Sequence, residues 1–104
     1  MLLVREIMYC KPGKVKAMVE KTLAMQKLMK KSPNQPTMRV MTDFCGERFW
    51  MCVMEMDVPD MATFEKLMSG EGESQESMKE FESIMKGYHD LVDHGRREIY
   101  KIEA

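Results

Sequence analysis

Residues 37–57 read TMRVMTDFCGERFWMCVMEMD and form two apolar-rich runs on either side of a turn that contains glycine. Two such runs around a short glycine-containing connection are typical of a β-hairpin. We therefore predict strands over residues 37–45 and 48–57. If Gly46 and Glu47 form a two-residue turn, residue 42 lies opposite residue 51 and residue 40 lies opposite residue 53.

The sequence on either side of this hairpin supplies the other elements of the fold. A strand is indicated where an apolar run ends in glycine or proline, and a helix where apolar residues recur every three or four positions. These criteria predict a strand over residues 2–10, a helix over 14–31, an interrupted helix over 59–94 and a strand over 96–102.

The second helix carries its own start, break and stop signals. Asp57 is the expected N-terminal cap, with a proline in the first turn that follows. A glycine-rich segment over residues 69–73 interrupts the helix, and Ser77 with Glu80 forms a capping box from which it resumes. Gly95 is the expected C-terminal cap.

The resulting order β-α-β-β-α-β predicts an α+β protein with the ferredoxin-like arrangement. Right-handed crossovers place both helices on one face of a four-stranded antiparallel sheet. A chain of 104 residues has the size expected of one domain, which we place over residues 1–104.

The composition argues against several classes of protein. A formal net charge of −1 is unfavourable for a nucleic-acid-binding module, and the adjacent Phe49 and Trp50 point to opposite faces of a strand instead of stacking bases together. No apolar run reaches the length of a membrane-spanning helix, and the first residues lack the pattern of a signal peptide. Three cysteines without CxxC spacing are typical of a reducing compartment. We expect a cytoplasmic protein with no nucleic-acid and no membrane partner.

The face of the predicted sheet that the helices leave uncovered is more apolar than a sheet face exposed to water. In the register above, the helix-covered face carries Met38, Val40, Thr42, Phe44, Phe49, Met51 and Val53. The other face carries Arg39, Met41, Asp43, Cys45, Arg48, Trp50, Cys52, Met54 and Met56. The second set is too apolar for a sheet face in water, where polar and apolar residues alternate cleanly. We therefore expect a homodimer in which sheet packs against sheet around an inner cavity.

Two motifs extend this picture to a known group of proteins. The first strand is followed by Lys-Pro-Gly-Lys at residues 11–14, and the chain closes with Gly-Arg-Arg-Glu-Ile-Tyr at residues 95–100. With the amphipathic helix, hairpin and broken second helix between them, these motifs resemble the dimeric α/β-barrel superfamily over essentially the whole chain. Within it, the chain is similar to the NIPSNAP-like and antibiotic-biosynthesis-monooxygenase-like branches. The resemblance implies a homodimeric α/β barrel.

The superfamily includes cofactor-free oxygenases that act on aromatic polyketides, haem-binding and haem-degrading enzymes, lactone isomerases and proteins without a known activity. The fold therefore does not select one function among them.

Candidate ligand-binding residues lie on the expected inner face of the dimer. They are Tyr9, Arg39, Asp43, Trp50 and Tyr100. Together they offer an aromatic wall and a polar clamp, which favours a homodimer that binds a small apolar or aromatic molecule. The resemblance implies cofactor-independent monooxygenase-like chemistry for such a site. One alternative is a non-catalytic dimeric module whose cavity is filled by its own methionines and Trp50.

A second alternative is haem binding or haem degradation. Haem-handling members of the superfamily take the axial histidine from the second helix, and the resemblance makes His89 the corresponding residue here. His89 and Asp93 lie four positions apart on the predicted helix, so the carboxylate could orient the imidazole. A structural role is the favoured interpretation of His89, and haem binding is the alternative to it. Apart from haem, we expect no cofactor and no metal.

Methionine is the unusual component, with 14 of 104 residues. Thioether sulfur suits Cu(I), but Met51 and Met54 point to opposite faces of a strand, and only Met54 and Met56 share one. We therefore interpret the methionines as flexible core-filling residues.

Overall fold

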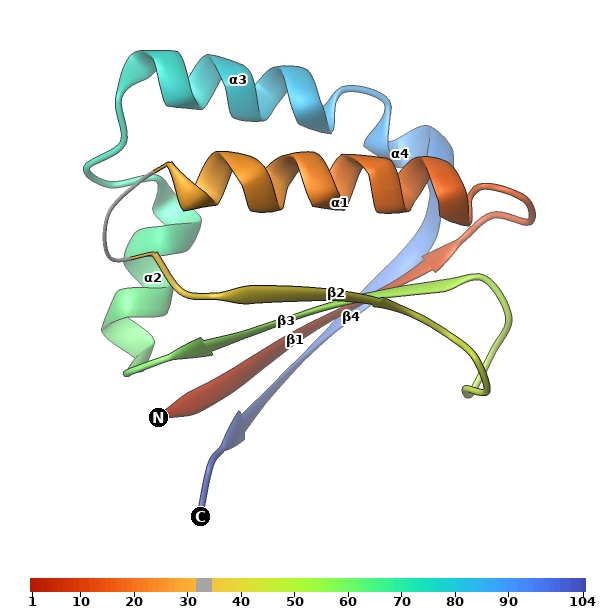
Figure 1. Cartoon of the computed structure of the whole chain (residues 1–104), viewed down its shortest axis with the longest axis horizontal. Helices are drawn as coiled ribbons and strands as arrows, with labels where there is room; N and C mark the ends of the chain where they lie inside the picture. Colours follow the sequence, from red (N-terminus) through yellow and green to blue (C-terminus); the bar gives the residue numbers. More distant parts are fainter. Residues whose placement is uncertain (32–34) are drawn as a thin grey trace.

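A computed structural model describes residues 1–31 and 35–104, and it confirms the ferredoxin-like α+β fold. One four-stranded antiparallel sheet has the strand order β2-β3-β1-β4, and the helices lie on one of its faces (Figure 1). The elements are β1 (Leu2–Cys10), α1 (Val15–Lys30), β2 (Met38–Thr42), β3 (Met51–Val58), α2 (Met61–Ser69), α3 (Gln75–Met85), α4 (Tyr88–Leu91) and β4 (Val92–Lys101). We call the face without helices the open face.

The helices after β3 begin at residues other than those we predicted. Asp60, not Asp57, caps α2, because Asp57 still belongs to β3 and the Asp60 carboxylate accepts from Thr63 N at 2.8 Å. Ser74 caps α3 by accepting from the backbone N–H of Ser77 at 3.1 Å, so Ser77 lies inside the helix instead of starting it.

The end of the second helical segment also differs from the prediction. The chain leaves α3 at Gly87, whose φ of +84° is a left-handed conformation that favours glycine, and only the short α4 follows. β4 then begins at Val92, so Gly95 is a strand residue and not a helix cap. It lies opposite Met8 in β1, where a Cβ atom would come within 3.3 Å of the Ile7 carbonyl oxygen.

The β2–β3 connection is longer than the predicted two-residue turn and shifts the register by one residue. Thr42 lies opposite Cys52 and Val40 opposite Met54. Residues 43–50 form the connecting loop, because the Asp43 carboxylate accepts from Met51 N at 2.8 Å and so closes a wider turn. β2 keeps its predicted faces, but every β3 side chain exchanges faces.

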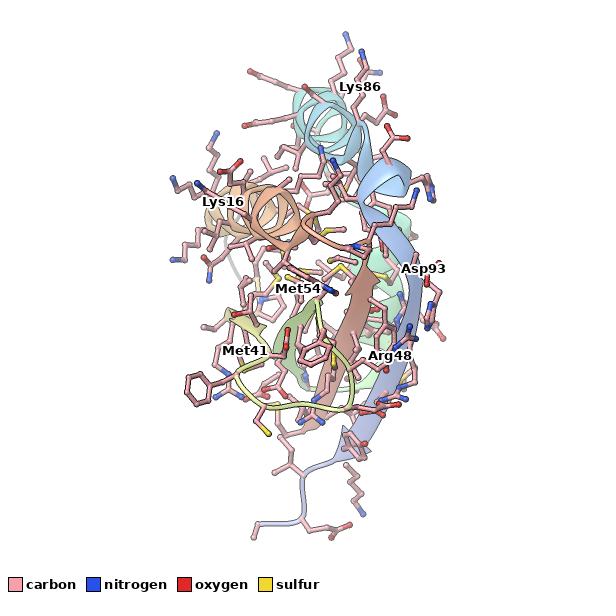
Figure 2. All side chains as sticks on the ribbon, turned by 90° about the vertical axis from the view of Figure 1, so that its right-hand side faces the viewer. Lys16, Met41, Arg48, Met54, Lys86 and Asp93 are labelled. Carbon is pink, nitrogen blue, oxygen red and sulfur yellow. The ribbon has the colours of Figure 1, made fainter. Side chains whose placement is uncertain are left out.

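This slip corrects our assignment of the two sheet faces. Cys52, Met54 and Met56 point toward the helices, and Figure 2 shows Met54 between the sheet and the helix layer. Met51 and Val53 lie on the open face instead. The open face is therefore less apolar than predicted, and it gives a dimer less apolar surface to bury.

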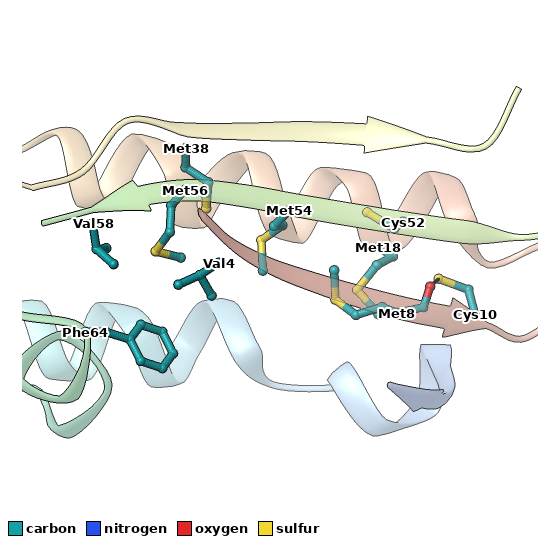
Figure 3. Packing of buried hydrophobic residues seen from close by; sticks show 10 residues of the cluster. All are labelled: Val4, Met8, Cys10, Met18, Met38, Cys52, Met54, Met56, Val58 and Phe64. Atoms are coloured by element: carbon teal, nitrogen blue, oxygen red, sulfur yellow. Dashed lines mark hydrogen bonds between the residues drawn. The ribbon is translucent and has the colours of Figure 1, made fainter. Parts of the chain in front are cut away.

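The main core lies between the sheet and the helices. Its buried residues are Val4, Met8, Cys10, Met18, Met38, Cys52, Met54, Met56, Val58 and Phe64 (Figure 3). A smaller cluster of Ile7, Tyr9 and Met51 is buried on the open face, where the loop over residues 43–50 dips away from the helices (Figure 1).

Candidate functional site: a methionine-lined cavity

A cavity of about 350 Å³ lies between the helix layer and the sheet. Ten of the chain's 14 methionines line it: Met8, Met18, Met25, Met29, Met38, Met54, Met56, Met68, Met78 and Met85. Methionine has a flexible side chain and a polarizable sulfur, so a wall of this kind can adapt its shape to an apolar or aromatic molecule. The cavity volume is within the range of small-molecule pockets.

The cavity exists because α3 carries an apolar side that is not packed onto the sheet. None of the α3 residues is buried, although Met78, Phe81 and Met85 follow one another at helical spacing. All three line the cavity, and Met78 and Phe81 remain 42% and 43% exposed. An amphipathic helix normally buries such a side, so this one is left available to a ligand.

Charged side chains at the cavity are already engaged by other protein groups. Glu6 pairs with Arg97 across β1 and β4. The ammonium of Lys21 on α1 donates to the carbonyl oxygens of Ile84, at 2.8 Å, and of Lys86. Lys21 therefore ties α1 to the C-terminal end of α3, where a cation also suits the helix dipole.

Two polar groups at the cavity remain suited to contact a bound molecule. Within the part of the chain that the structure describes, Gln35 Oε1 is a buried acceptor without a hydrogen-bond partner, while Gln35 Nε2 donates to Glu73 at 3.3 Å. Burial, with the nearby Glu6 carboxylate, raises the pKa of the Tyr88 hydroxyl above its ordinary value. Tyr88 therefore stays protonated at neutral pH and offers a donor.

The open face of the sheet carries a row of alternating charges that crosses all four strands. Arg39 lies opposite Glu55, Glu55 opposite Arg5, and Arg5 opposite Glu98. The ion pairs measure 2.6 Å from Arg39 to Glu55, 2.7 Å from Arg5 to Glu55 and 3.5 Å from Arg5 to Glu98. The Tyr100 hydroxyl donates to Glu98 at 2.9 Å, which raises the Tyr100 pKa.

At one end of this row, the loop over residues 43–50 covers Tyr9. The Tyr9 hydroxyl donates to the Glu47 carboxylate at 3.2 Å, and the Arg48 guanidinium lies 4.9 Å from the centre of the Tyr9 ring. The His94 ring stacks on Tyr9 with a centroid distance of 4.5 Å, and its Nε2 lies 3.1 Å from Arg48 Nη1. These contacts leave Tyr9 only 4% exposed, so it is a packed residue in the single chain.

The structure divides the six sequence-predicted site residues among three places. Tyr9, Arg39 and Tyr100 share the open face, as predicted. Asp43 and Trp50 belong to the β2–β3 loop, where Asp43 holds the turn and Trp50 is 44% exposed with a φ of +66°. His89 is an exposed residue of α4, and its ring meets that of Tyr88 edge-on at 5.2 Å. Among the described residues that line the cavity, none of these six is present.

The position of His89 does not suit an axial haem ligand for this cavity. The predicted pairing with Asp93 is wrong, because Asp93 lies in β4 and contacts His94 at 3.2 Å. His94 itself is a residue of β4. No group of three or more His, Cys, Asp or Glu side chains within residues 1–31 and 35–104 is arranged to hold a metal ion.

Sequence reasoning missed the residues that surround the cavity. The signal was present in the spacing of Met78, Phe81 and Met85, but helical spacing alone cannot distinguish a packed face from one that stands over a cavity. The described helices include none that is long and apolar enough to cross a membrane.

Comparisons with known proteins find the same fold in solved structures. An uncharacterised NIPSNAP domain protein from Burkholderia xenovorans aligns with a TM-score of 0.78 at 11% identity, over 100% of this chain and 96% of that one. A NIPSNAP family protein from Agrobacterium tumefaciens aligns with a TM-score of 0.70 at 11% identity, over 97% and 92%. A protein from Nitrosomonas europaea, provisionally named as an antibiotic biosynthesis monooxygenase, aligns with a TM-score of 0.68 at 13% identity over 100% of both chains.

No protein-family model and no curated protein matches the sequence. The structural likeness confirms the fold that the sequence resemblance predicted. At these identities it does not transfer an activity.

Proposed function

We propose that this protein binds a small apolar or aromatic molecule in the methionine-lined cavity. The observation that carries the proposal is the apolar side of α3, which faces the cavity without being buried by the protein's own core. A ligand placed there would bury Met78, Phe81 and Met85, and burial of apolar surface is the main favourable term in such binding.

The polar groups at the cavity suggest one further property of the ligand. Gln35 Oε1 would accept a hydrogen bond from a hydroxyl or amine of the bound molecule, which removes the cost of leaving this atom without a partner. Tyr88 would donate to an oxygen atom. The ligand we expect is therefore apolar over most of its length and carries at least one hydrogen-bonding group.

A binding role is favoured over a catalytic one by the state of the ionisable groups. Cofactor-independent oxygenation of an acidic substrate needs a base in contact with the bound molecule. The charged residues Glu6 and Lys21 are held by Arg97 and by the end of α3, and Tyr88 is protonated at neutral pH. In a monooxygenase-like reaction, Glu6 would have to leave Arg97, or Lys21 the end of α3, before it could act as the base.

A fluorescence titration with N-phenyl-1-naphthylamine, a neutral aromatic probe, tests the proposal. The wild-type chain should bind the probe saturably. Met25→Trp, which enlarges a half-buried residue of the cavity wall, should weaken binding at least tenfold, because the indole occupies the probe's space. Leu23→Trp is the matched control, since Leu23 lies on the same helix but is 41% exposed and outside the lining. Non-saturable binding, or equal binding by both variants, would contradict the proposal.

We also propose that residues 1–104 form a homodimeric barrel. Fewer exposed apolar residues support the dimer than the sequence suggested. Met41 on the open face is 36% exposed, and Phe44 and Phe49 of the adjoining loop are 105% and 83% exposed. A second copy that packs on this face would cover Met41 and the loop. It would also place Arg39 and Tyr100 at the interface, where they would act as contacts between copies instead of ligand-binding groups, whereas Tyr9 would stay covered by the loop of its own chain.

Light scattering in solution tests the dimer. The wild-type chain should have twice the mass of 12.2 kDa. Met41→Glu should shift it toward the monomer by placing an unpaired charge in the interface, whereas Leu23→Glu, on the helix side, should remain dimeric. A monomer at all concentrations would end the dimer proposal and leave the cavity proposal intact. The three free cysteines fit the reducing cytoplasm as the place where this protein acts.

A further inference from the structure

Four sulfur-bearing side chains converge at the end of the main core where β1 ends. Met8 in β1 lies directly opposite Cys52 in β3, and Cys10 points to the same face two residues further along β1. Met18 of α1 covers this group from the helix side. Figure 3 shows the four side chains together at one end of the core cluster.

All four side chains are withdrawn from solvent. Met8 and Cys10 are 5% and 6% exposed, and Met18 and Cys52 are fully buried. Directly opposite residues of an antiparallel pair have Cβ atoms about 5 Å apart, and same-face diagonal neighbours are about 7 Å apart. These separations allow the sulfur atoms of Met8, Cys10 and Cys52 to reach one common point.

The polar partners of the two thiols are weak ones. The Cys10 Sγ lies 3.9 Å from the Met8 carbonyl oxygen, and the Cys52 Sγ lies 3.9 Å from Thr22 Oγ1. Both thiols are free, with no disulfide. Neither sulfur is therefore committed to a strong interaction that a metal ion would have to displace.

Met8, Met18 and Thr22 belong to the wall of the methionine-lined cavity. A soft ion that enters the cavity meets the thioether sulfur of Met8 and Met18, and the thiols of Cys10 and Cys52 lie behind this wall in the same core cluster. Hard cations such as Mg²⁺ find no comparable set of oxygen ligands, and Zn²⁺ lacks the histidine and carboxylate ligands that would complete a tetrahedral site in the described chain.

We infer that Met8, Cys10, Met18 and Cys52 form a binding site for a soft monovalent metal ion, Cu(I) or Ag(I). Thiolate and thioether sulfur are the ligands that such ions prefer. Binding replaces the thiol protons by the metal and releases them to solvent, and no electron is transferred. This assignment departs from our expectation of no metal site, which rested on the methionines of β3 alone and could not place Met18 and the two cysteines beside Met8.

The test is competition for Cu(I) with the chelator bicinchoninate, under ascorbate and without oxygen. The wild-type chain should remove one Cu(I) per chain from the chelator. Cys10→Ser and Cys52→Ser should each weaken uptake at least a hundredfold, and Met18→Leu, which conserves volume, about tenfold. Cys45→Ser and Met61→Leu are the controls, since both residues are exposed and lie outside the cluster.

X-ray absorption at the copper edge is measured on the wild-type complex. It therefore does not depend on whether the serine variants fold. It should show sulfur as the only neighbours of copper. Absence of uptake by the wild-type chain, nitrogen or oxygen neighbours, or loss of uptake in Cys45→Ser with retention in Cys52→Ser would overturn the assignment.

Discussion

Glu55 lies opposite Arg39 across the β2–β3 pair, with Arg39 Nη2 2.6 Å from Glu55 Oε1. The second carboxylate oxygen of Glu55 lies 2.7 Å from Arg5 Nε, so one acid holds two arginines on neighbouring strands. The Glu55 side chain is only 7% exposed, although it lies on a face without helices. The arginine side chains themselves shield it from water.

Glu55→Gln should destabilise the fold by about 1–2 kcal/mol. The amide keeps the shape of the side chain but loses the charge that two guanidinium groups share. The arginines are 36% and 67% exposed, so water compensates part of the loss. Urea unfolding followed by circular dichroism measures the change as a lower midpoint.

Glu103→Gln is the matched control for this prediction. Glu103 pairs with Lys101 at 3.8 Å, and both side chains are more than three-quarters exposed. Its removal should change stability by less than about 0.5 kcal/mol. Equal midpoints for the two variants would show that the charge row on the open face does not contribute to stability.

Lys21→Met should destabilise the attachment of α3. The substitution removes the ammonium that donates to the Ile84 and Lys86 carbonyl oxygens while keeping an unbranched side chain of similar length. Loss of these charge-assisted hydrogen bonds should cost about 1–2 kcal/mol. Amide hydrogen exchange should be faster in α3 than in the wild type.

Lys16→Met provides the comparison, because Lys16 is an exposed residue on the same helix and lies on the outer surface in Figure 2. It should leave exchange in α3 unchanged. If Lys16→Met accelerates α3 exchange as much as Lys21→Met does, the helix is held by general charge attraction and not by this contact.

The three cysteines should differ sharply in reactivity. Cys45 is exposed, whereas Cys10 and Cys52 are buried. Ellman's reagent at pH 8 should therefore modify one thiol per native chain quickly and all three after unfolding. Cys45→Ser should abolish the fast phase, and a fast phase that persists in this variant would mean that the core opens readily.

The raised pKa of Cys10 predicts how stability depends on pH. The unfolded thiol ionises near its ordinary value of 9.0, while the folded thiol retains its proton until about 11. Above pH 9 the unfolded state therefore binds fewer protons than the folded state, and stability falls as pH rises toward 11. The contribution is fully present below pH 9. Cys10→Ala should flatten this decline in urea unfolding between pH 8 and pH 11, and an unchanged slope would contradict the assignment.

The fold could be predicted from the sequence because each element carries its own local signal. The apolar run before Lys-Pro-Gly, the helical spacing of α1 and the glycine-containing hairpin are all local patterns that tertiary contacts did not override. The caps at Asp60 and Ser74 were misplaced by three residues each, since several Asp and Ser residues compete for these positions.

The candidate site could not be predicted from the sequence. It depends on the β2–β3 register and on the distance between α3 and the sheet, and local sequence patterns encode neither. One side-chain hydrogen bond, from Met51 N to Asp43, sets the length of the β2–β3 loop and with it the face of every β3 residue. The distance between α3 and the sheet then decides whether Phe81 fills the core or lines a cavity.

The methionines offer the most direct measurement of where a ligand binds. In a chain labelled with ¹³C-methyl methionine, ten methyl signals belong to the cavity wall, whereas Met1, Met41, Met51 and Met61 lie outside it. Titration with N-phenyl-1-naphthylamine should shift the signals of cavity methionines such as Met25, Met54 and Met78 and leave those four in place. Shifts confined to Met41 and Met51 would place the ligand on the open face and would contradict the account.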